Sequence, residues 1–79
     1  MKKSLYSKRH KALIRVLKEA REAAGLTQQA VADKLGKPQS FVAKYENGER
    51  RLDVVEFLWV TEALGVAANL LLDEIHEAN

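Results

Sequence analysis

The segment that decides the fold is TQQAVADKLGKPQSFVAKYENG, which runs from Thr27 to Gly48. The Thr27 hydroxyl is suited to capping a helix, and an apolar stripe follows it as far as Gly36, which tolerates the left-handed conformation that ends helices. Pro38 suits the first turn of a second helix, because its fixed φ is helical and its missing N–H is not needed there. The segment therefore predicts two short helices joined by a tight turn, at about residues 27–35 and 38–46.

The second of these helices is predicted to have two different faces. Val42 and Tyr45 lie three residues apart and can share the buried face. Phe41 lies at the edge between the faces, and we expect it to pack partly into the core rather than to contact a base. A short turn forces the two helices to cross steeply and leaves the other face free, which is typical of DNA-binding helix-turn-helix motifs. That free face consists of Gln39, Ser40, Ala43, Lys44 and Asn47.

Further matching positions lie on both sides of this segment, in the order and at the spacing of a known pattern. They are Leu17, Arg21, Gly25-Leu26-Thr27-Gln28, Val31-Ala32, Leu35-Gly36, Val42, Tyr45-Glu46-Asn47-Gly48 and Ala63-Leu64-Gly65-Val66. Over roughly Leu13 to Ile75 the chain resembles the phage-repressor and Cro-like helix-turn-helix proteins, also called the XRE family. The resemblance implies an all-α fold, a compact five-helix bundle of the lambda-repressor-like DNA-binding type, in a regulator of transcription.

The resemblance also implies roles for individual residues. Gln28 stands where the family binds a phosphate beside the first base-contacting residue of the second helix, although it also fits an ordinary exposed position. Arg21 and Glu46 match a partly buried salt bridge that fixes the angle of the recognition helix. The phosphate contacts after that helix would fall on Asn47, Gly48, Arg50 and Arg51, where arginines suit anions.

The base-contacting positions of the family fall on three residues of the recognition helix, and their chemistry suits the task. Gln39 can form paired hydrogen bonds with adenine, and Lys44 can donate to guanine acceptors. Ser40 can serve a base or a phosphate, with plain surface exposure as the alternative. Ala43 can rest against a thymine methyl group or leave room for the DNA.

The composition of the 79-residue chain fits one small domain, because 47% of its residues are apolar and it has one proline. The sequence contains no cysteine, which excludes disulfides and thiolate zinc sites. His10 and His76 have no second histidine nearby, so we expect surface titration and no metal site. We find no catalytic triad, phosphate loop or carboxylate pair, and we expect neither an enzyme nor a cofactor.

Charge is distributed unevenly along the chain. Residues 1–21 carry eight Lys or Arg against Glu19 alone, whereas residues 52–79 carry six acids and no Lys or Arg. We expect one basic and one acidic end, so that a phosphate field orients the domain, with two simply solvated ends as the alternative. We expect residues 1–11 to form a basic flexible arm before a single domain at 12–79. Phosphate or minor-groove contacts of the arm would come from Lys8, Arg9 and Lys11.

Three more helices complete the prediction, at about residues 8–24, from Asp53 to Leu64 and at 67–76. Asp53 and Glu56 resemble a capping box, and Gly65 follows the last residue of that helix. Its inward stripe would be Phe57, Val60, Thr61 and Leu64, and that of the last helix Ala68, Leu71, Leu72 and Ile75. The apolar residues left outside predict a dimer interface, with a tryptophan folded onto its own monomer as the alternative: Val55, Trp59 and Leu70.

These features together predict a homodimeric transcription regulator that binds double-stranded DNA at an approximately palindromic operator and acts as a repressor. The alternative is a protein-interaction module, such as an antitoxin or antirepressor, in which DNA binding is secondary. Met1-Lys2-Lys3 is not followed by an apolar stretch of adequate length, so we expect no signal peptide, no membrane span and a cytoplasmic protein.

Overall fold

The computed structural model describes residues 7–78, which form five helices and no strand. The predicted all-α bundle is therefore confirmed. Each helix lies within one or two residues of its predicted position. The helices are α1 (Lys8–Ala23), α2 (Gln28–Leu35), α3 (Gln39–Glu46), α4 (Val54–Leu64) and α5 (Ala68–Glu77).

Local capping explains where the helices begin and end. The Thr27 hydroxyl accepts a hydrogen bond from the Ala30 N–H at 3.0 Å, and Gly36 ends α2 in a left-handed conformation with φ of 67°. The capping box of Asp53 with Glu56 begins α4. The expectation for Pro38 was wrong by one position, because Pro38 precedes α3 as its N-cap with an extended ψ of 156°. Its ring fixes φ alone, so it fits either position.

The core draws residues from every helix. The largest fully buried side chains come from α1 to α4, and α5 adds the buried Leu71. Thr61 is also buried, and its hydroxyl is satisfied by donating a hydrogen bond to the Leu58 carbonyl at 2.9 Å. The predicted stripe of α4 is confirmed in full. The largest of the fully buried side chains are Leu17, Val31, Val42, Val60 and Thr61.

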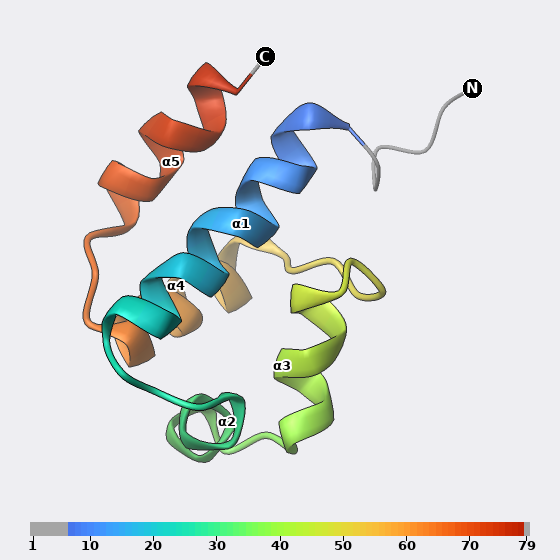
Figure 1. Ribbon diagram of the computed structural model, residues 1–79, viewed down its shortest axis with the longest axis vertical. Coiled ribbons are helices and arrows are strands. Elements are labelled where there is room, and N and C mark those ends of the chain that lie inside the picture. The colour runs from blue at the N-terminus through green and yellow to red at the C-terminus, as the bar shows by residue number, and fades with distance from the viewer. Residues whose placement is uncertain (1–6, 79) are drawn as a thin grey trace.

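The arrangement in space separates α3 from the acidic C-terminal helix. Figure 1 shows α5 beside the blue N-terminal half of α1, whereas α2 and α3 lie toward the other end of the bundle. The expectation of one basic and one acidic end was therefore wrong. The acidic helix packs against the basic one, and Arg15 of α1 lies 4.0 Å from Glu74 of α5. Opposite charges that lie far apart in sequence attract in space.

Helices α4 and α5 are rich in apolar residues. Among residues 7–78 no single helix is both long and apolar enough to cross a membrane. The two helices meet those criteria only as a pair, and they are bent by 119° relative to each other.

Candidate nucleic-acid interface

Helix α3 has one packed face and one exposed face. Val42 and Tyr45 are buried, and burial raises the pKa of the Tyr45 hydroxyl well above its ordinary value. The predicted contact residues Gln39, Ser40 and Lys44 are exposed on the other face. Ala43 is half-buried, and Asn47 is exposed as the C-cap of the helix. The exposed face can therefore approach a groove without disturbing the core.

A chain of hydrogen bonds connects α1 with the beginning of α3. The Arg21 guanidinium donates to both carboxylate oxygens of Glu46, at 2.7 and 3.1 Å, and to the Leu26 carbonyl at 2.9 Å. The Gln28 amide donates to Glu46 Oε1 at 2.9 Å. The Gln39 amide in turn donates to Gln28 Oε1 at 2.7 Å. This network fixes the last residue of α3 and positions the amide of its first residue.

The Arg21–Glu46 pair is the buried part of this network. Only 13% of the Arg21 side chain and 2% of the Glu46 side chain are exposed. Hydrogen bonding to the Glu46 carboxylate raises the pKa of Arg21, so the guanidinium stays charged. The structure thus contains the salt bridge that the sequence predicted, and it adds Gln28 as a third member that the sequence placed only beside Gln39.

The loop after α3 presents two arginines in different ways. Arg51 is exposed. Arg50, which was also predicted to contact phosphate, donates to Glu56 Oε1 at 3.1 Å and Oε2 at 2.8 Å. Its guanidinium also lies 4.6 Å from the ring centre of Phe41, which is buried as expected. The capping box, which places the Glu56 carboxylate near the loop, was the one signal for this pair in the sequence.

Gly48 makes the sharp turn that follows α3. Its φ is +78°, a left-handed conformation that L side chains rarely adopt, and a Cβ at this position would lie 3.3 Å from Ile14 Cδ1. The N–H groups of Glu49 and Arg50 both donate to the Lys44 carbonyl, at 2.8 and 3.2 Å. The first half of the loop is thereby bound to α3.

The second half of the predicted basic arm belongs to a helix. Lys8, Arg9 and Lys11 belong to the first turns of α1, which begins after the Ser7 cap. The Arg9 guanidinium donates to the His76 carbonyl at 3.1 Å, so this side chain lies against the end of α5. Residues 1–6, the rest of the predicted arm, lie outside the described residues.

His10 differs from the expected surface histidine. It is partly buried, and its Nε2 atom is covered and has no hydrogen-bond partner among residues 7–78. Burial, and secondly the nearby charge of Arg51, lower the pKa of His10. The sequence carried no signal for this, because the α3–α4 loop approaches His10 only in the folded chain.

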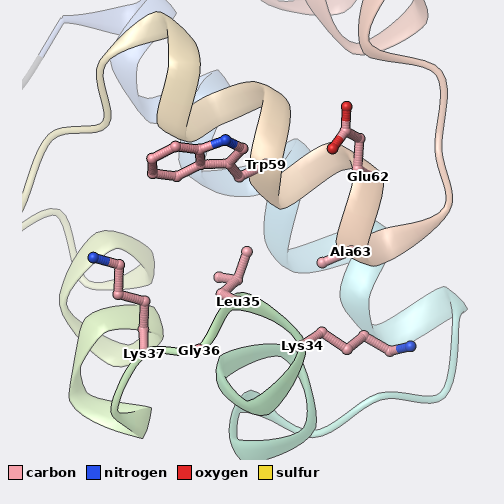
Figure 2. Close-up of a pocket in the computed structure, with 7 residues that line it drawn as sticks. All are labelled: Lys34, Leu35, Gly36, Lys37, Trp59, Glu62 and Ala63. Atoms are coloured by element: carbon pink, nitrogen blue, oxygen red, sulfur yellow. The ribbon is translucent and has the colours of Figure 1, made fainter.

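The exposed apolar surface is larger than the sequence predicted. Val55, Trp59 and Leu70 are exposed as expected, and Figure 2 shows Trp59 above an open pocket between α4 and the end of α2, with Leu35 between Lys34 and Lys37. Leu72 was expected to face the core but is 49% exposed. It lines a second, apolar groove with residues of α1, the α3–α4 loop, α4 and α5, including Leu13, Leu52, Val54, Phe57, Leu58 and Ile75.

Comparison with known proteins agrees with this architecture. The sequence profile of the helix-turn-helix family matches residues 17–71. An XRE-family like protein from Pseudomonas syringae pv. tomato str. DC3000 is 49% identical, with a TM-score of 0.83 over 87% of this chain and 84% of that one. The chain belongs to the XRE family of helix-turn-helix proteins. Membership of this family makes it a DNA-binding regulator of transcription.

Other solved structures resemble this XRE-family chain. The restriction-modification controller protein C.AhdI from Aeromonas hydrophila is 31% identical, with a TM-score of 0.72 over 78% of this chain and 94% of that one. The clp gene regulator ClgR from Corynebacterium glutamicum shares the fold at 22% identity, with a TM-score of 0.78 over 87% of this chain and 90% of that one. A comparison with curated proteins found no match.

Proposed function

We propose that the chain is a homodimeric repressor that binds an approximately palindromic DNA operator, with α3 in the major groove. The observation that carries this proposal is the network from Arg21 through Glu46 and Gln28 to Gln39. A buried ion pair is costly to desolvate, and here the network built on this pair fixes both ends of α3, the helix whose free face is polar. Preorganised side chains of this kind bind without a further ordering cost.

The proposed contacts follow from position and chemistry. Gln39 would pair with adenine and Lys44 with guanine, while Ser40 would donate to a base or phosphate and Ala43 would lie against a thymine methyl group. The phosphate contacts would come from both sides of α3: Gln28 at the start of α2, and Asn47, Gly48 and Arg51 in the following loop.

Two-fold symmetry would place the two α3 helices about 34 Å apart, one turn of DNA. We assign the self-contact to exposed apolar residues of α4 and α5, because a small domain with several such residues gains from covering them. Sedimentation at about 50 µM protomer tests this, and a monomer at that concentration would contradict the homodimer.

Binding titrations test the assignment of contacts. Operators are first selected from a random DNA pool, and then binding to the selected and scrambled sequences is compared. Lys44→Ala should weaken the selected site by about 1–3 kcal/mol and relax preference at one base pair. Arg51→Ala should weaken both sequences alike and reduce the salt dependence. Lys18→Ala removes an exposed charge from α1 and serves as the control. If Lys44→Ala weakens binding to both sequences equally, Lys44 does not take part in base recognition.

A reporter gene separates repressor from activator. The selected operator is placed over the promoter, and expression is measured with and without the protein. Expression should fall, and a rise would contradict the repressor assignment.

A second function is favoured by the apolar surface around Trp59, which is 49% exposed above its pocket. In this alternative the chain is a protein-interaction module whose surface covers another protein, as in an antitoxin or antirepressor. A monomeric chain that selects no DNA sequence would support this function over the first.

A further inference from the structure

Arg50 is held from three directions. Its guanidinium donates to both oxygens of Glu56 and, through one of the same nitrogens, to the Arg51 carbonyl at 3.1 Å. The group lies over the Phe41 ring, with 4.6 Å between the guanidinium carbon and the ring centre. One side chain thus connects α3, the following loop and the first turn of α4.

Glu56 is held as firmly as its partner. Its Oε1 atom also accepts from the Asp53 N–H at 3.0 Å, and the Glu56 N–H donates to Asp53 Oδ1 at 2.7 Å. The hydrogen bonds from Arg50, and secondly from the Asp53 backbone, lower the pKa of Glu56 to about 2. The carboxylate is therefore ionised at neutral pH and bound to the rigid start of a helix.

We propose that Arg50 and Glu56 are positioning residues for DNA binding, which hold residues 47–51 in the shape that presents Arg51 to the DNA backbone. The backbone hydrogen bonds to Lys44 fix the first half of this loop, and the Arg50 side chain fixes the second half to α4. The proposal rests on the function proposed above and assigns Arg50 a role through the loop, without a phosphate contact.

The alternative role of Arg50, a phosphate ligand, predicts the opposite effect of one substitution. Glu56→Gln removes a negative charge beside the interface, so electrostatics alone would strengthen DNA binding. It would also release Arg50 for a phosphate. If the pair positions the loop, the same substitution weakens binding. Glutamine still accepts the Asp53 hydrogen bond of the capping box, so α4 keeps its first turn.

Arg50→Lys provides the second discriminating variant. Lysine keeps the charge and binds phosphate well, but it cannot make the forked pair with Glu56 or stack in the same way on Phe41. A phosphate-binding role would survive this change. A positioning role would not.

The experiment measures affinity for the selected operator over a range of salt concentrations, with Glu77→Gln as the matched control for loss of an exposed acid. Active protein is counted by titration at high DNA concentration, so that any loss of folded material does not enter the affinity. Glu56→Gln and Arg50→Lys should each weaken binding at least about threefold, with a salt slope equal to that of the wild type. Glu77→Gln should leave affinity unchanged.

Unchanged or tighter binding by Glu56→Gln, or wild-type affinity of Arg50→Lys, would overturn the proposal. The function proposed above fails differently, because in that case the wild-type chain itself selects no operator.

Discussion

Removing Arg21 should destabilise the fold far more than removing an exposed arginine of the same helix. Arg21→Ala withdraws two hydrogen bonds from the Glu46 carboxylate, of which 2% is exposed, and leaves Gln28 as its donor. Breaking a buried ion pair from one side costs about 3–5 kcal/mol. We expect about 3 kcal/mol here, because Gln28 still donates and the Arg21 side chain is itself 13% exposed, so water can enter.

The matched control is Arg15→Ala. Arg15 forms an i,i+4 pair with Glu19 in which the side chains are 50% and 61% exposed, so its loss should cost at most about 0.5 kcal/mol. Urea unfolding followed by circular dichroism at a fixed protomer concentration gives both values. In thermal unfolding, Arg21→Ala should lower Tm by roughly 12–24 °C.

Equal destabilisation by the two variants would refute this reasoning, since it would mean that the Arg21–Glu46 pair behaves as a surface pair. A double variant, Arg21→Ala with Glu46→Ala, tests the cause. It should be more stable than Arg21→Ala alone if the cost comes from the carboxylate left without its partner, and it should be less stable if each side chain contributes independently.

Two further predictions concern α1 and the turn after α3. Burial lowers the pKa of His10 below its usual 6.5, so protonation of His10 favours the unfolded chain. The contribution of neutral His10 to the free energy of unfolding is complete above pH 6.5, and it is lost as the pH falls through the lowered pKa. Urea unfolding at pH of about 7.5 and 5.5 should show a smaller loss in His10→Gln than in the wild type, and equal losses would refute it. Gly48→Ala should lower the free energy of unfolding by more than the roughly 1–2 kcal/mol expected for Gly36→Ala. Both glycines are left-handed, but only at Gly48 would the added Cβ meet Ile14. Equal values in the same assay would show that the Ile14 side chain moves away without cost.

Local sequence rules predicted the parts of the fold that depend on neighbouring residues. The Thr27 cap, the Gly36 terminator and the capping box of Asp53 each involve residues four or fewer apart, and each forms as predicted. The inward stripe of α4 also followed from helical spacing alone. In these cases the physical cause lies within one helical turn, so the sequence was sufficient.

The errors concern relations between elements that are distant in sequence. Leu72 and Leu71 are neighbours on α5, and which of them is buried depends on how the helix rotates against α1. His10 is partly buried and lies near the charge of Arg51, a residue 41 positions away that comes close only in the folded chain. The contacts of Arg50 with Glu56 and Phe41 were not predicted either, because they form only after the chain turns at Gly48. Helical periodicity identifies the residues that share one face of a helix, but it does not identify the element that packs against that face.

The two acids near α3 show how the interface can combine rigidity with attraction for DNA. Glu46 and Glu56 would each repel phosphate if unpaired. Each instead holds an arginine in a pair with no net charge, at distances of 2.7 and 2.8 Å. Lys44 and Arg51 are exposed, and neither forms an ion pair within residues 7–78. Under the proposed function, Arg21 and Arg50 would fix the shape of the interface, and Lys44 and Arg51 would supply its charge. Arg50→Lys keeps the charge but loses the forked pair with Glu56, so it should change affinity with little change in salt slope, whereas removal of Arg51 should change both.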